Sequence, residues 1–130
     1  MKIQGVSTHG TTFVPTWNGN DKLPAAEQIS MVIYPMTEGD VGAAADVEYD
    51  QERKTIKNRV SALEDRIFAN RVVEIKNLVV VVDGKDLPIE SGDPWLIHRR
   101  HLPPKMRKLY AEIQEEIRRI SQLDEDAEKN

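Results

Sequence analysis

The sequence predicts a single α+β domain. Two runs rich in β-branched and aromatic residues open the chain, and two later stretches repeat their apolar residues with a helical period. A valine run beside a turn pair lies between those two stretches. The predicted architecture is an N-terminal β-hairpin and a second short hairpin packed with two to four α-helices, ending in a C-terminal amphipathic helix. A mainly α-helical fold is the alternative.

The N-terminal hairpin is predicted from residues 11–17 and 28–34. One face of the second run carries its apolar residues Ile29, Met31 and Ile33. The segment between the runs, NGNDKLPAA, indicates a loop, because Asn18-Gly19 favours a turn and Pro24 prevents a strand from resuming directly after it. We therefore expect a wide connection between the two strands.

Residues 37–46, TEGDVGAAAD, predict at most a weak helix. Thr37 and Asp40 are spaced as a helix cap, whereas two glycines lower the stability of any helix that follows. We expect this segment to be the most flexible one inside the fold.

A surface helix is predicted over residues 50–70. Its apolar side chains recur at steps of four, three and four, and charged residues occupy most of the other positions. The apolar residues are Ile56, Val60, Leu63, Ile67 and Phe68.

The second hairpin is predicted from residues 77–89, NLVVVVDGKDLPI. Four consecutive valines favour a strand, and Asp83-Gly84 is a preferred pair for a tight turn.

Two helices are predicted after this hairpin. Asp93-Pro94 resembles a cap followed by proline at the first helical position, which gives a short helix over residues 94–101 that Pro103 and Pro104 must end. The final helix begins at these prolines and carries one apolar stripe. Its members are Met106, Leu109, Tyr110, Ile113, Ile117, Ile120 and Leu123.

The apolar stripe of the final helix has two interpretations, a surface for a partner helix and an intramolecular core. Stripes of this kind are more often core, so we assign no partner-binding residue to it. Trp17 and Trp95 are likewise interpreted as core residues more readily than as interface anchors.

Composition restricts the class of protein. The chain has no cysteine, which excludes disulfides, thiolate catalysis and cysteine-based zinc sites and favours a reducing, cytosolic setting. The first ten residues lack the apolar run of a signal peptide, and the longest apolar run, residues 78–82, is too short to span a bilayer. We therefore expect no membrane partner. A net charge of −4 gives no general attraction to nucleic acid.

No catalytic, cofactor-binding or metal-binding residue is predicted. His98 and His101 would share a helix face, but no third ligand lies near them, so we interpret them as ordinary surface histidines. No serine sits in a nucleophile-elbow pattern, and neither VVDGKDL nor WNGNDK has the spacing of a phosphate-binding loop. We therefore expect a protein that is not an enzyme and uses no cofactor.

A basic segment surrounds the two prolines and comprises Arg99, Arg100, Lys105, Arg107 and Lys108. A charged exposed face is the usual explanation, and a nucleic-acid site is the less favoured one. Three of these cations lie in the first turns of the last helix, where the positive end of the helix dipole disfavours them. We therefore hypothesise an acidic partner, such as the tail of another copy, and salt-sensitive self-association.

Three segments, at both ends and in the middle of the chain, carry a resemblance to a known family. They read TTFVPTWNGNDKLPAAEQISMVI, VVEIKNLVVVVDGKDL and LYAEIQEEIRRISQLDEDAEKN. Together they resemble the tail assembly chaperones of long-tailed (siphovirus-type) bacteriophages. The resemblance implies a protein without enzymatic activity or cofactor that binds the tape measure protein and the tail tube protein. It also implies a place in the host cytoplasm during tail morphogenesis and absence from the mature virion.

Residues 124–130 form an acidic tail after a predicted single domain of residues 1–123. The tail carries four acidic residues and one lysine, so it holds −3 of the net charge of −4. The family that the chain resembles commonly makes a longer product, because ribosomes slip one nucleotide backwards near the end of the short frame. Residues 128–130 can be encoded GAA AAA AAC, which contains a slip-prone heptamer. We therefore interpret the tail as a candidate frameshift junction, an end in the short form and a linker in the long one.

Three other functions stay open. A structural virion component, either a head–tail connector or a tail tube protein, would share the size and the lack of catalytic residues. A small nucleic-acid-binding regulator would use the segment from Arg99 to Lys108. A hydrolase or metal enzyme built on His98 and His101 ranks last, because ligands and a nucleophile are missing.

Overall fold

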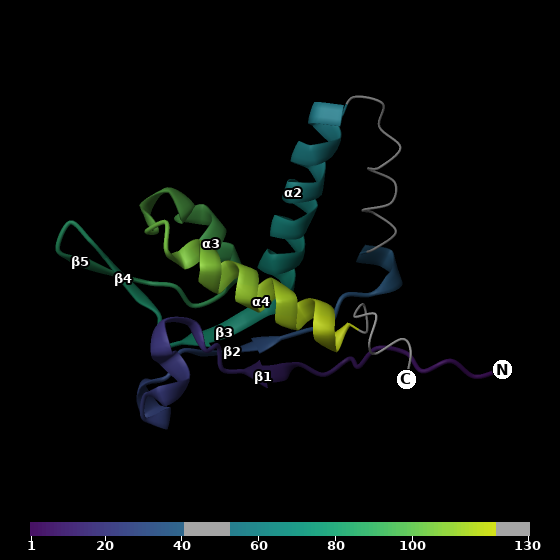
Figure 1. Cartoon of the computed structure of the whole chain (residues 1–130), viewed down its shortest axis with the longest axis horizontal. Helices are drawn as coiled ribbons and strands as arrows, with labels where there is room; N and C mark the ends of the chain where they lie inside the picture. Colours follow the sequence, from purple (N-terminus) through teal and green to yellow (C-terminus); the bar gives the residue numbers. More distant parts are fainter. Residues whose placement is uncertain (41–52, 122–130) are drawn as a thin grey trace.

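The computed structural model describes residues 1–40 and 53–121, with side chains described for 1–40 and 62–121. It has the predicted α+β class, with two small antiparallel sheets and helices packed beside them (Figure 1). The first sheet has the strand order β1 (Thr11–Phe13), β2 (Ser30–Ile33) and β3 (Val72–Lys76). The second sheet is the hairpin of β4 (Val79–Val82) and β5 (Lys85–Pro88).

The predicted N-terminal hairpin is present, with Thr12 opposite Val32 in an antiparallel pair. The prediction that its first strand reaches Trp17 is wrong. The strand ends at Phe13, because Pro15 has no N–H to donate to a ladder. The wide connection contains two 3-10 helices, η1 (Trp17–Lys22) and η2 (Ala25–Glu27), where only a loop was expected.

Strand β3 was not predicted from the sequence. It starts directly after the last residue of the preceding helix and pairs antiparallel with β2, placing Val72 opposite Ile33. The N-terminal hairpin is therefore part of a three-stranded sheet. The β2–β3 pairing shifts register between Ser30 and Val32, and Glu74 takes a positive φ of 49°, which is typical of a β-bulge.

Helix α2 (Arg53–Arg71) confirms the surface helix predicted before β3. Leu63 and Phe68 are buried and Ile67 is half-buried, whereas the side chains of Ile56 and Val60 lie outside the described ones. The predicted cap at the start of the 37–46 segment is also present. The backbone N–H of Thr37 donates to the carboxylate of Asp40 at 2.9 Å. The expected flexibility concerns mainly residues 41–46, which lie outside the described residues.

The predicted helix over residues 94–101 is two elements, α3 (Gly92–Ile97) and η3 (Arg99–His101). The prediction that Asp93 caps it is wrong, because Ser91 is the residue before the first helical one. The start of α3 lies against the end of α2. A Cβ on Gly92 would stand 2.3 Å from the carbonyl oxygen of Phe68, so only glycine permits this approach.

Helix α4 (Met106–Ile120) begins just after the two prolines, as predicted. Five of its stripe residues are buried, Ile120 is half-buried, and Leu123 lies outside the described residues. The buried ones are Met106, Leu109, Tyr110, Ile113 and Ile117. They join residues of β2, β3, α2 and α3 in one apolar core. The stripe is therefore intramolecular core, which is the interpretation that the sequence favoured.

Candidate partner-binding site

The β4–β5 hairpin stands out from the body of the protein at the end opposite the N-terminus (Figure 1). Its turn is the predicted Asp83-Gly84 pair, whose φ angles of 50° and 77° are those of the tight turn that suits a hairpin. Strand β4 pairs with β5 in a regular register that places Val80 opposite Leu87 and Val81 opposite Asp86. The second hairpin is therefore confirmed.

The register leaves one edge of β4 open. The N–H of Ile89 donates to the carbonyl of Leu78 at 2.9 Å, so Leu78 belongs to a hydrogen-bonded pair of the ladder. Hydrogen-bonded pairs alternate with non-bonded pairs in an antiparallel ladder, so the N–H and C=O groups of Val79 and Val81 point away from β5. Within the described residues, no backbone group pairs with these four atoms.

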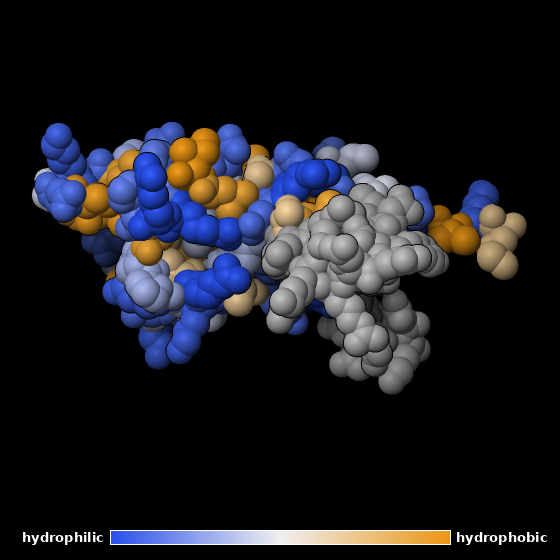
Figure 2. All heavy atoms as spheres, turned by 90° about the horizontal axis from the view of Figure 1, so that it is seen from above, coloured by the Kyte–Doolittle hydropathy of each residue, from blue (hydrophilic) through white to orange (hydrophobic). Residues whose placement is uncertain are grey.

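The two edges of this hairpin differ in how well they are protected against pairing with a further strand. On β5 the residue opposite Val79 is Pro88, which offers no N–H to a further strand. On β4 the outer residues carry no charge, and the side chains of Val79 and Val81 are 50% and 64% exposed. An open, uncharged and apolar edge is the kind to which another chain adds a strand. Figure 2 shows apolar surface at this end of the molecule.

A groove of about 550 Å³ runs beside the β4 edge. Residues 77–81 form one side of it, and the apolar residues across from them include Trp17, Ile29 and Met106. His101 and Lys105 also line the groove and give it a basic margin. The groove therefore combines unpaired backbone groups, apolar walls and positive charge.

Three long-range contacts hold the groove walls in place. The indole N–H of Trp17 donates to the carbonyl of Lys105 at 3.2 Å. The carboxylate of Glu112 accepts from the backbone N–H groups of Thr16 and Trp17 at 2.6 and 3.0 Å. The side-chain amide of Asn77 donates to the carbonyl of Gln28 at 2.8 Å. No local sequence pattern indicates this role of Glu112, because the residues it binds lie 95 and 96 positions away in the sequence.

A polar cluster joins α2, η3 and α4 behind the groove. The guanidinium of Arg99 donates to both carboxylate oxygens of Asp65, and the phenol of Tyr110 donates to the same carboxylate at 2.7 Å. Burial alone would raise the pKa of Asp65, but the hydrogen bonds from Arg99 and Tyr110 lower it below its ordinary value. Burial and the bond to Asp65 raise the pKa of Tyr110 to about 12.

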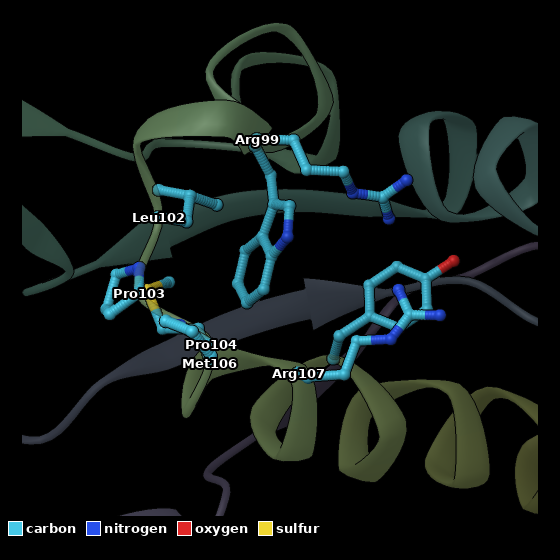
Figure 3. Close-up of a pocket in the computed structure, with 8 residues that line it drawn as sticks. Arg99, Leu102, Pro103, Pro104, Met106 and Arg107 are labelled. Atoms are coloured by element: carbon cyan, nitrogen blue, oxygen red, sulfur yellow. The ribbon is translucent and has the colours of Figure 1, made fainter.

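A smaller pocket, of about 160 Å³, lies beside this cluster. Arg99 enters it from η3 and Arg107 from α4, and their guanidinium groups lie toward the same side (Figure 3). The apolar residues Leu102, Pro103 and Met106 lie on the other side. The predicted basic segment is thus divided, because Arg99 is engaged by Asp65 whereas Arg107 makes no ion pair with a described residue.

The remaining predicted residues fall into two groups. Trp95 is 2% exposed and belongs to the core, as interpreted, whereas Trp17 is half-buried at the groove. His98 and His101 line a hollow beside the β4–β5 turn together with Asp83 and Asp86. Among residues 1–40 and 53–121, no group of three or more histidine, aspartate or glutamate residues is arranged to hold a metal ion.

No protein-family model, curated protein or solved structure matches the chain. None of the helices in the described part of the chain combines the length and the apolar character needed to cross a bilayer.

Proposed function

We propose that this chain is a tail assembly chaperone of a long-tailed bacteriophage, which binds the tape measure protein and the tail tube protein while the tail is built. The observation that carries the proposal is the open β4 edge beside an apolar groove. The resemblance of three sequence segments to this family supplies the identity of the partners.

The groove suits an unassembled partner for a physical reason. The tape measure polypeptide exposes apolar segments before the tube encloses it, and exposed segments aggregate unless another chain covers them. An extended apolar segment can place its backbone against Val79 and Val81 and its side chains against Trp17, Ile29 and Met106. A segment that fills this groove makes a small contact, and small contacts are reversible. A chaperone requires a reversible contact, because the segment must later leave for the tail.

Co-purification from cells that express the tagged chain with tape measure and tail tube polypeptides tests the proposal. We expect both to be retained, and retention to fall at least about tenfold, or about 1.4 kcal/mol, when Val79→Asp and Val81→Asp are combined. The matched control is Ile97→Asp, which changes an apolar residue that is 66% exposed on α3 and should keep binding.

A second variant separates backbone pairing from side-chain contact. Val81→Pro removes the outward N–H but no bond to β5, so the hairpin should survive while strand addition is blocked. If neither polypeptide is retained by the native chain, or if the Val79/Val81 variant binds as well as the Ile97 control, the chaperone function is wrong.

Two further observations separate this function from its competitors. Recovery of the chain in purified particles, at the copy number of a tail component, would favour the structural virion protein. Salt-dependent retention on DNA that is lost in Arg99→Ala with Arg100→Ala would favour the nucleic-acid-binding regulator. The nucleotide sequence across codons 125–130 shows directly whether the slip-prone heptamer exists.

A further inference from the structure

We propose that the pocket between Arg99 and Arg107 binds a carboxylate of an acidic peptide segment, and that the segment is residues 124–128 of a second copy of this chain. The inference goes beyond the proposed chaperone function. It concerns a different hollow from the β4 groove and does not depend on a phage partner.

The first observation is a cation, Arg107, that forms no ion pair with a described residue and acts on the Asp65 carboxylate only through its charge. The guanidinium of Arg107 lies 5.2 Å from the centre of the Tyr110 ring, and the guanidinium of Arg99 lies 5.3 Å from the same centre. Arg99 already has both carboxylate oxygens of Asp65 as partners. Arg107 has no hydrogen-bond or ion-pair partner among the described residues, so its donors are available to a ligand in the pocket.

The second observation is the indole N–H of Trp95, which lines the same pocket. The residue as a whole is 2% exposed, but its indole nitrogen keeps contact with water. No described residue accepts a hydrogen bond from this N–H. An acceptor bound in the pocket would satisfy this donor together with Arg107.

The shape and setting of the pocket favour a side-chain carboxylate. Its volume of about 160 Å³ suits a carboxylate on a short aliphatic stem and is small for a nucleotide. Leu102, Pro103 and Met106 offer apolar contacts to the methylene groups of such a stem (Figure 3). The pocket also adjoins the first residues of α4, where the helix dipole attracts negative charge.

The acidic tail of the chain has the matching chemistry. Residues 124–128 include four carboxylates, and the exposed Lys105 and Lys108 near the pocket add attraction to them. Along α4, the pocket lies about 21 Å from the C-terminal end of the same helix. Asp124 follows Ser121 by three residues and reaches at most about 10 Å from it. The chain's own Asp124 therefore cannot reach the pocket, and a second copy must supply that residue.

The test uses the full chain, ¹⁵N-labelled, with its four tail acids changed to amides so that the pocket starts empty. The peptide SQLDEDAEKN is titrated into it at low salt, with SQLNQNAQKN as the uncharged control. We expect the acidic peptide alone to shift the indole N–H resonance of Trp95. The Trp17 resonance, whose N–H already donates to the Lys105 carbonyl, should move little and serves as the internal control.

Three substitutions, two at Arg107 and one at Arg118, make the assignment specific. Arg107→Gln should weaken peptide binding at least about tenfold, and Arg107→Lys should restore part of it because the charge returns. Arg118 is another exposed cation of α4, and it does not line this pocket. The Arg118→Gln variant should therefore bind the acidic peptide as the native residue does. Sedimentation of the native chain should show self-association at 50 mM salt that weakens at 500 mM and is lost with the amide tail.

Two results would overturn the proposal. One is a Trp95 resonance that does not move with the acidic peptide at low salt, or that moves equally in Arg107→Gln. The other is an equal shift with inorganic phosphate at the same concentration, which would make the pocket a phosphate site. Neither result bears on tape measure or tube binding, which is tested separately at Val79 and Val81.

Discussion

The carboxylate of Asp65, on α2, accepts hydrogen bonds from both terminal nitrogens of Arg99, on η3, at 2.8 and 2.9 Å. The phenol of Tyr110, on α4, donates to the same carboxylate and accepts from the amide of Gln114 at 2.9 Å. One carboxylate thus ties α2 to η3 and α4, whose bonded residues lie 34 and 45 positions further along the chain. This cluster forms one boundary of the Arg107 pocket, so its integrity bears on both the fold and the proposed tail site.

Replacing Asp65 by asparagine should destabilise the chain by about 1–3 kcal/mol at neutral pH, because hydrogen bonds to a charged acceptor are lost. The pKa of Asp65 is lowered on folding, so its contribution is present above the ordinary value of 3.8 and is lost as the pH falls below it. Urea unfolding at a series of pH values from 7 to 2 measures the free energy of unfolding as a function of pH. The native chain should lose more stability than Asp65→Asn between pH 5 and pH 2, and Glu64→Gln should behave as the native chain does. If the free energy of unfolding fell equally with pH in the native chain and in Asp65→Asn, the role given to this carboxylate would be wrong.

Tyr110 should give an absorbance step near pH 12 in a spectrophotometric titration of the phenols. Burial and the adjacent carboxylate raise its pKa to about 12, so the phenol is neutral in the folded chain when an unfolded one would ionise near pH 10. Its contribution to stability is complete below pH 10 and is lost as the pH rises through 12. The absorbance step near pH 12 should be absent from Tyr110→Phe. A Tyr110→Phe chain that keeps this step would show that another tyrosine produces it.

Local sequence patterns predicted α4 and the β4–β5 hairpin because each depends on neighbouring residues. The 3.6-residue period placed Leu109, Ile113 and Ile117 on the buried face, and the turn chemistry of Asp83-Gly84 fixed the hairpin. Strand β3 gave no comparable signal. It follows Arg71 without a turn or glycine, and its partner strand β2 lies about 40 residues earlier, so only tertiary pairing defines it.

The functional surfaces were harder to predict than the elements. Asp65 and Arg99 are 34 residues apart and looked like ordinary surface charges in their own helices. One signal was present, because Tyr110 lies on the buried stripe and a buried phenol needs a hydrogen-bond partner. The open edge at Val79 and Val81 depends on which strand lies beside β4, and a run of valines does not carry that information.

Glu112→Ala should destabilise the N-terminal connection by about 1–2 kcal/mol, since the carboxylate caps η1 from a distance of 96 residues in sequence. It accepts from the N–H of Thr16 at 2.6 Å and from the N–H of Trp17 at 3.0 Å, and no other described acceptor serves those donors. Amide hydrogen exchange at Thr16 and Trp17 should become faster in this variant. Glu115→Ala, on the same helix without such bonds, is the matched control. Unchanged exchange at both amides in Glu112→Ala would contradict the cap.

Ile113→Ala and Val81→Ala should differ sharply in their effect on stability and on partner binding. Ile113 is fully buried in the α4 stripe, so its truncation removes apolar contacts and leaves a cavity, at a cost of about 2–5 kcal/mol. Val81 is 64% exposed, so the same kind of truncation should change the free energy of unfolding by no more than about 0.5 kcal/mol.

Partner retention should follow the opposite order when both variants are assayed under conditions where they are folded. The Val81 variant should bind tape measure and tube polypeptides less well, because it loses contact area at the β4 edge. The Ile113 variant should bind them normally, because its side chain never reaches the surface. Urea unfolding followed by circular dichroism measures the first quantity and co-purification the second. If Ile113→Ala left stability unchanged while abolishing partner binding, the α4 stripe would be a docking surface, and its assignment to the core would be wrong.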